Sequence, residues 1–162
     1  MLRYLVRTLP VVLRARLRSG GNVSRLHRRV GLRDIDVNLH MNQAVYAQVT
    51  ELGRVDWILG SGAWDRWRAQ GISPVVAEQR IVYRRELKPL TPYTVETRAV
   101  AVEGRLLCFE SHLRVGDRVH ALCEVKLIFL GEGGVLDADR VEAICEGLLV
   151  PPLPVSDWRV TG

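Results

Sequence analysis

The longest helical pattern in the chain carries more apolar surface than an exposed helix needs. It covers residues 43–59 and has two neighbouring stripes: Val45, Val49, Leu52, Asp56 and Leu59, and beside them Ala44, Ala47, Glu51, Val55 and Ile58. Together the stripes form a wide apolar arc, whereas a helix on the surface of a domain buries one face. The pattern therefore predicts a helix that other parts of the fold cover on most sides, and GSGAW at 60–64 ends it.

Strand-like alternation surrounds this helix in the sequence. One run precedes the helix and four runs follow it, at 24–37, 75–86, 93–102, 106–115 and 119–130. Alternation of apolar and polar residues is typical of strands with one buried face. A curved antiparallel sheet of about five strands around one long helix accounts for both patterns. We therefore expect an α+β fold, with the last four strands as a meander.

The 162 residues are enough for one domain with a core of its own. We expect a leader and joint at 1–22, with RSGGN at 18–22 as the flexible joint, one domain at 23–150, and an extended tail at 151–162. A short helix should close the domain, with Asp137 or Asp139 as its N-cap. Its apolar face comprises Val141, Ile144, Cys145 and Leu148.

The cysteines and histidines give no sign of a metal site. The three cysteines are far apart, and each falls on the apolar phase of its segment, so we expect small buried hydrophobic residues. Such a set is typical of a reducing compartment, which favours a cytoplasmic location. His112 and His120 have polar neighbours on their strand faces, so we expect them to face solvent. No pair of histidines has the spacing of a metal site.

Positive charge is concentrated at the front of the chain. Residues 1–30 hold eight arginines and no acidic residue, whereas residues 31–162 hold 15 basic and 18 acidic residues. A nucleic-acid-binding domain would carry a basic face on its body, so this distribution argues against nucleic acid as a partner.

The leader, residues 1–18, has an amphipathic helical pattern in which Pro10 is expected to kink or end the helix. Its longest apolar run is too short to span a bilayer. Two interpretations remain open. The leader makes peripheral contact with an anionic membrane, or it packs on the domain or on a partner subunit with its arginines in solvent.

The sequence DVNLHMN at 36–42 places polar residues at every other position. In an extended chain, these side chains would all point to one side: Asp36, Asn38, His40 and Asn42. Polar side chains on a buried face need a partner or a function. The residues alone leave two interpretations: a functional site, or a network that merely satisfies backbone groups at the start of the helix.

A longer stretch around this motif, DIDVNLHMNQAVYAQVTELGR at 34–54, resembles the signature of the hotdog-fold thioesterases. That superfamily includes 4-hydroxybenzoyl-CoA thioesterase-like enzymes and acyl-ACP thioesterases. RRELKPLTPYTVET at 84–97 resembles the family's passage from the second to the third strand, and the likeness covers about residues 24–148. It implies a sheet wrapped around the central helix and a pocket at the interface of a homodimer. Two alternatives for the assembly stay open: the dimer alone, or a tetramer formed from two dimers.

The resemblance also implies roles in the hydrolysis of acyl-CoA or acyl-carrier-protein thioesters, with no metal and no cofactor beyond the substrate's own CoA or phosphopantetheine. Asp36 matches the catalytic aspartate, as general base or nucleophile. His40 would move a proton or polarise the carbonyl, and Asn38 would orient water or substrate. Glu51 is the second candidate carboxylate. Its alternative is a surface pair with Arg54.

Further residues are expected to bind the substrate: Asn42, Gln43, Tyr46, Arg80, Arg84, Arg85 and Lys88. Backbone N–H groups of residues 42–44, at the start of the helix, are expected to bind the oxyanion. The cationic side chains suit the phosphates of CoA or the acidic face of a carrier protein, although half of them are equally typical of sheet-edge charges. Many relatives carry a second asparagine where this chain has Gln43.

Three functions follow from the resemblance. The leading one is an acyl-CoA thioesterase of fatty acid metabolism. The second is a non-catalytic hotdog protein that binds acyl-CoA or lipid at a membrane surface, which the leader favours and the four candidate catalytic residues disfavour. A hotdog dehydratase fits less well, because the layout of the motif is that of the thioesterases.

Overall fold

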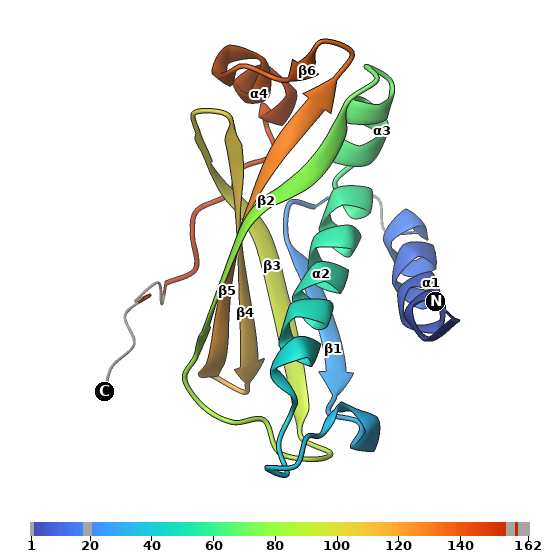
Figure 1. The fold of residues 1–162 in the computed structure, drawn as a ribbon, viewed down its shortest axis with the longest axis vertical. Helices are drawn as coiled ribbons and strands as arrows, with labels where there is room; N and C mark the ends of the chain where they lie inside the picture. The colour runs from blue at the N-terminus through green and yellow to red at the C-terminus, as the bar shows by residue number, and fades with distance from the viewer. Residues whose placement is uncertain (1, 18–20, 155–157, 159–162) are drawn as a thin grey trace.

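A computed structural model describes residues 2–17, 21–154 and 158. An antiparallel sheet curls around one long helix, α2, and further helices lie at its end and beside it (Figure 1). The expected α+β architecture, with a curved antiparallel sheet around a central helix, is confirmed. Parts of the expected joint and tail, residues 18–20, 155–157 and 159–162, lie outside the described residues.

The elements follow one another as α1 (Leu2–Leu17), β1 (Ser24–Arg29), the 3-10 helix η1 (Leu32–Asp34), α2 (Gln43–Gly60), α3 (Ala63–Arg68), β2 (Ser73–Tyr83), β3 (Pro92–Glu103), β4 (Leu106–Val115), β5 (Arg118–Gly131), β6 (Gly134–Val135) and α4 (Ala138–Cys145). The first strand is shorter than the expected 24–37, because the chain turns into η1 at Leu32. The short elements α3 and β6 were not predicted. The expected last helix is α4, and its N-cap is Asp137, which accepts the N–H of Arg140 at 2.9 Å.

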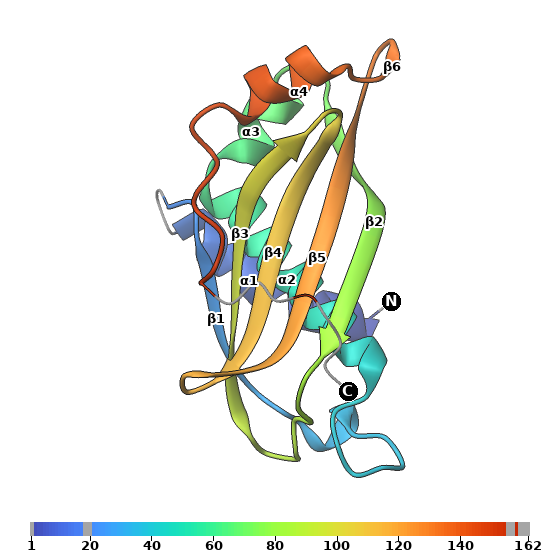
Figure 2. The same ribbon diagram turned by 90° about the vertical axis from the view of Figure 1, so that its left-hand side faces the viewer.

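The strands pair in the order β1-β3-β4-β5-β2, and β6 extends the sheet beside the end of β5. β2 pairs antiparallel with β5, with Ile81 opposite Cys123, and does not pair with β3, which follows it in the chain. The expected meander is therefore right for β3 to β5 and wrong for β2. Residues 84–91 carry the chain across from one side of the sheet to the other (Figure 2), and β2 forms an edge of the described sheet.

The inner face of the sheet packs on α2 and forms the apolar core. Trp57 of α2 meets Phe109 of β4 edge to face, with ring centroids 4.8 Å apart. Nearer the middle of the helix, Gly53 allows a close approach to β3, because a Cβ at this position would lie 2.4 Å from Oγ1 of Thr97. All three cysteines are buried, as expected. Of the two stripes predicted from the sequence, the first is buried apart from Leu59, whereas the second is half-buried and, at Ala44, exposed. The expectation that α2 is covered on most sides is therefore wrong for the described residues, which bury one broad face of the helix.

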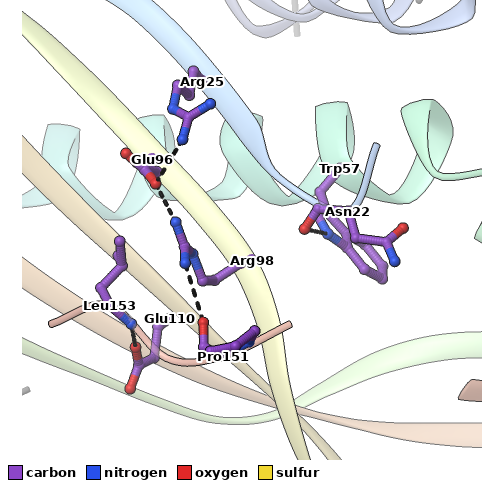
Figure 3. A network of polar contacts seen from close by, with 8 residues as sticks. All are labelled: Asn22, Arg25, Trp57, Glu96, Arg98, Glu110, Pro151 and Leu153. Atoms are coloured by element: carbon purple, nitrogen blue, oxygen red, sulfur yellow. Dashed lines mark hydrogen bonds and ion pairs between the residues drawn. The ribbon is translucent and has the colours of Figure 1, made fainter. Parts of the chain in front are cut away.

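The outer face of the sheet is crossed by the tail that follows α4 (Figure 2). Nη1 of Arg98 donates a hydrogen bond to the carbonyl oxygen of Pro151 (3.1 Å), and the N–H of Leu153 donates to Oε2 of Glu110 (3.1 Å). Leu153 is buried, and Arg98, which binds the tail, also pairs with Glu96 of β3 (Figure 3). Polar side chains on this face are therefore enclosed where a bare sheet would leave them in water.

His112 of β4 is also buried on this face, although it was expected to face solvent. It is 0% exposed and lies opposite Glu96 of β3 and Leu122 of β5. Neither ring nitrogen has a hydrogen-bond partner among the described residues. Burial lowers the pKa of His112 to about 4, and the positive charge of Arg114 adds to this effect. The imidazole is therefore neutral at pH 7.

The leader forms the helix α1, which packs along α2 (Figure 1). Val11 and Ala15 are buried, and Nη2 of Arg14 donates to the carbonyl oxygen of Arg25 in β1 (2.8 Å). The helix continues through Pro10, which was expected to kink or end it. Pro10 is exposed, and because it has no N–H it donates no hydrogen bond within the helix. Within the described ranges, no helix is long and apolar enough to cross a membrane.

Candidate functional site

Residues 35–42 form a tight loop and not an extended run. An isolated bridge pairs Ile35 with Met41. Between them, the N–H of Asp36 donates to the carbonyl oxygen of His40 (3.1 Å), and the N–H of Leu39 donates to that of Asp36 (3.1 Å). Leu39 has φ +61°, a left-handed conformation that leucine seldom adopts. The expectation of one extended strand face is therefore wrong, and a turn gathers the polar residues of the motif instead.

Two backbone hydrogen bonds fix this loop against its neighbours. The N–H of Met41 donates to the carbonyl oxygen of Leu87 (2.8 Å), and the N–H of Asn42 donates to that of Asp34 (2.8 Å). Met41 and Leu87 are both buried. The motif loop is thus held between η1 and the loop that follows β2, directly before the start of α2.

A cavity of about 580 Å³ lies between these two loops and the first turns of α2. Its lining consists of Asp36, Asn38, His40, Met41, Asn42, Gln43, Tyr46, Tyr83, Arg84, Arg85 and Glu86. Eight of the eleven site residues expected from the sequence meet here. They come from two segments, 36–46 and 84–85, which the crossover after β2 brings together.

Asp36 and His40 lie close to each other at the cavity. Nδ1 of His40 is 3.9 Å from Oδ1 of Asp36, and both side chains are partly exposed, at 34% and 22%. The same carboxylate oxygen accepts the backbone N–H of Asn38 at 2.9 Å, which orients the carboxylate. At this separation, one water molecule or a small movement would connect the imidazole with the carboxylate. The loop therefore presents an acid–base pair to the cavity.

The start of α2 supplies a backbone donor to the same cavity. Asn42 is the N-cap of α2, and its Oδ1 accepts the N–H of Ala44 at 2.9 Å. The interpretation of the motif as a capping network is thus correct for Asn42. Three N–H groups were expected to bind the oxyanion. Two of them, those of Asn42 and Ala44, already donate hydrogen bonds to acceptors within the protein. Among the described residues, the N–H of Gln43, the first residue of the helix, has no acceptor.

An aromatic pair forms one wall of the cavity. Tyr46 of α2 is buried and meets Tyr83 of β2 edge to face, with ring centroids 5.1 Å apart. Burial raises the pKa of the Tyr46 hydroxyl, a hydrogen bond with the backbone of Leu87 opposes the rise, and the negative charges of Glu86 and Asp36 add to it. Tyr46 is therefore a neutral phenol at pH 7, able to donate a hydrogen bond.

Three of the expected site residues do not line the cavity. Glu51 is half-buried and lies further along α2 than the residues of the lining. Arg80 is exposed on β2, and its Nη2 donates to the carbonyl oxygen of Trp158 (2.8 Å). Lys88 is exposed, with its Nζ 3.2 Å from Oε1 of Glu86. Within one chain, these residues are not gathered with the motif.

Sequence reasoning missed three residues of the lining: Met41, Tyr83 and Glu86. Tyr83 ends β2 directly before the two arginines, so an aromatic residue next to candidate phosphate ligands was an available signal. Met41 and Glu86 gave no signal, because their positions follow from the packing of one loop on the other.

The lining offers carboxylate, imidazole, amide, phenol and guanidinium groups. In the part of the chain that the structure describes, no group of three or more His, Cys, Asp or Glu side chains is placed to hold a metal ion. A carboxylate and an imidazole can activate water, and a backbone N–H at the start of a helix can bind a developing negative charge. The arrangement therefore suits the hydrolysis of a carbonyl compound.

Comparison with known proteins identifies the family and the fold. The family model of the thioesterase-like superfamily matches residues 30–150. A probable thioesterase from Escherichia coli shares the fold with a TM-score of 0.72 and 19% identity over 78% of this chain and 99% of that one. A DHNA-CoA thioesterase from Staphylococcus aureus has a TM-score of 0.60 and 19% identity over 73% of this chain and 82% of that one. A 1,4-dihydroxy-2-naphthoyl-CoA thioesterase from Synechocystis has a TM-score of 0.62 and 11% identity over 77% of this chain and 97% of that one. The resemblance seen in the sequence is confirmed, and the chain belongs to the thioesterase-like superfamily with its hotdog fold.

Proposed function

We propose that this protein hydrolyses acyl-CoA thioesters, with acyl-carrier protein as the alternative carrier of the same bond. Membership of the superfamily supports thioester hydrolysis as the type of reaction. The observation that carries the proposal is the pair of Asp36 and His40 at a cavity next to the N-terminus of α2. A base, a proton donor and an oxyanion donor are the groups that this reaction needs, and the cavity offers one of each.

In the proposed reaction, Asp36 takes a proton from a water molecule as that water attacks the thioester carbonyl carbon. The N–H of Gln43 binds the resulting oxyanion. When the tetrahedral intermediate collapses, the C–S bond breaks and protonated His40 gives its proton to the departing thiolate. The proton that Asp36 gained then passes to His40 through one bridging water molecule, or after a small movement closes their 3.9 Å separation. The products are a free acid and a thiol. Direct attack by Asp36, through a mixed anhydride, is the alternative path with the same residues.

The remaining polar groups of the lining would orient the reactants. Asn38 and the neutral phenol of Tyr46 can hold water or the acyl group by hydrogen bonds. The guanidinium groups of Arg84 and Arg85 suit the phosphates of CoA. The backbone N–H groups of both arginines donate to the carbonyl oxygen of His120, at 2.9 and 3.0 Å, so β5 fixes their position. Arg80 and Lys88 do not line the cavity and have no part in the proposed reaction.

A homodimer along β2 is the proposed working unit. Val75, Val76 and Tyr83 of this edge strand are 41%, 45% and 48% exposed. An edge strand with apolar side chains and unpaired backbone groups is a surface that proteins usually cover. Because Tyr83 also lines the cavity, a second copy paired along β2 would help to close the cavity's open side.

The proposal is tested by measuring the release of free thiol from a panel of acyl-CoAs with a thiol reagent. Asp36→Asn is expected to lower kcat by about 100-fold or more, because a general base or nucleophile is lost while size and shape are kept. The matched control is Asp139→Asn, on an exposed residue of α4 at the far end of the molecule (Figure 1), and it should keep the parental kcat.

Circular dichroism and thermal unfolding of both variants show whether the fold is kept. Parental turnover in Asp36→Asn would contradict the assignment of Asp36. Binding of acyl-CoA without thiol release from any member of the panel would favour the non-catalytic acyl-CoA-binding function instead.

A further inference from the structure

Helix α1 has two apolar faces, and the fold uses one of them. Val11 and Ala15 are 5% and 1% exposed and form the face that packs against the domain. Leu9, Leu13 and Leu17 are 59%, 56% and 87% exposed. Residues two apart on an α-helix point about 200° away from each other, so this leucine row lies opposite the buried face. The row is an apolar strip turned away from the core.

Positive charge flanks the leucine row. Arg14 and Arg16 are exposed, and they point about 100° to one side and about 60° to the other side of Leu13. Residues 1–30 contain eight arginines and no acidic residue, so the segment does not neutralise its own charge. An apolar strip between cationic side chains has the chemistry of a helix that lies in a membrane interface.

We propose that α1 is a docking surface for an anionic lipid bilayer. The helix lies parallel to the membrane plane, with the leucine row among the upper acyl chains and the arginines at the lipid phosphates. The domain holds α1 in place through the buried Val11 and Ala15 and through the hydrogen bond from Arg14 to Arg25, so the surface is formed before it meets the membrane. This inference goes beyond the proposed hydrolysis, since no residue of the cavity takes part.

Other occupants fit this surface less well. A symmetric contact between two copies would place the same arginine-flanked strip against itself, so like charges would meet. A nucleic acid would pair with the arginines but would leave the leucines in water, where they gain nothing from binding. Both the apolar row and the charges contribute when the partner has acyl chains below anionic headgroups.

The experiment is flotation of the full chain with vesicles of phosphatidylcholine, with and without phosphatidylglycerol. Binding is expected to require the anionic lipid and to weaken as salt is added, because arginine–phosphate attraction is screened. The double variant Leu9→Ser/Leu13→Ser is expected to bind at least about tenfold more weakly, since it removes the apolar surface that inserts. The matched control Leu149→Ser replaces a leucine that is 41% exposed elsewhere and should bind like the parent.

A second variant, Arg16→Glu, tests the charge independently and should also weaken binding to anionic vesicles. Thiol release from a soluble acyl-CoA is expected to stay unchanged in all these variants, which separates this proposal from the proposed hydrolysis. Undiminished vesicle binding by the double leucine variant would overturn the proposal. So would variants that change the oligomeric mass instead of vesicle binding, or binding to duplex DNA that depends on Arg16 but not on the leucines.

Discussion

Acidification is expected to destabilise the fold through His112, the buried histidine on the outer face of the sheet. Burial, with a contribution from Arg114, lowers its pKa to about 4 in the folded protein, whereas the ordinary value is 6.5. Between these values the unfolded chain binds a proton that the folded chain does not bind, so stability falls as the pH falls through this window. The loss amounts to about 2 kcal/mol by pH 5 and about 3 kcal/mol by pH 4.

The assay is urea unfolding followed by tryptophan fluorescence, near pH 7.5 and near pH 5, at one protein concentration so that any association contributes equally. Trp57 and Trp67 are fully buried, so their emission reports on loss of the core. His112→Leu carries no titrating group at this position. Because Glu96 and Glu110 are present in both proteins, the difference between parent and variant isolates His112. The parent is expected to lose about 2 kcal/mol more than the variant.

The matched control is His27→Leu on the exposed side of β1, which should keep the parental loss. An equal loss in the parent and in His112→Leu would refute the reasoning, since it would mean that the folded protein protonates His112 as readily as the unfolded chain. Stability near pH 7.5 gives a second check. Among the described residues neither ring nitrogen has a partner, so leucine removes no hydrogen bond and the variant should be at least as stable as the parent.

Three further substitutions test the fold and the site. Gly53→Ala should lower the thermal unfolding midpoint and cost about 1–3 kcal/mol, because its Cβ would lie 2.4 Å from Oγ1 of Thr97 and the resulting displacement outweighs the better helix propensity of alanine. An unchanged midpoint would mean that α2 does not approach β3 this closely. Asn42→Ala should cost about 1 kcal/mol in urea unfolding through loss of the N-cap of α2, and no loss would contradict the capping geometry. Glu51→Gln should lower kcat less than Asp36→Asn in the thiol-release assay, because Glu51 does not line the cavity; an equal loss, with a displaced limb in the pH–rate profile, would place Glu51 at the reacting atoms.

The central helix could be predicted because its signals are local. The apolar pattern predicted 43–59, the structure has Gln43–Gly60, and Asn42 supplies a cap of the kind that commonly precedes a helix. Strict alternation located β3, β4 and β5 in the same way. Most of the candidate site was named from the sequence for a related reason: its residues lie in one contiguous motif or next to it.

Other features depend on contacts that are remote in sequence. The motif turns at 36–42 because its backbone forms hydrogen bonds with Asp34 and Leu87. The residues around Leu39 give no sign of its positive φ. β2 lies at the far edge of the sheet from β1, and the crossover at 84–91 connects it to β3. The alternation of residues within β2 predicts a strand but not that this strand pairs with β5. His112 has polar neighbours typical of a solvent-facing strand face, so its own segment gives no sign that it is 0% exposed in the fold.

The course of the tail that follows α4 bears on how copies of this domain could stack, if the proposed pairs assemble further. The N–H of Val150 donates to the carbonyl oxygen of Ala99 (3.0 Å), and from there the tail follows the outer face as far as the buried Leu153. Two sheets that stack back to back stand about 10 Å apart, with their side chains interdigitated. The tail occupies this space, and its removal would expose the carboxylate of Glu110 to an incoming sheet. If the proposed pairs were to assemble further, back-to-back stacking of sheets would require the tail to move, so we expect such contacts through helices or strand edges instead.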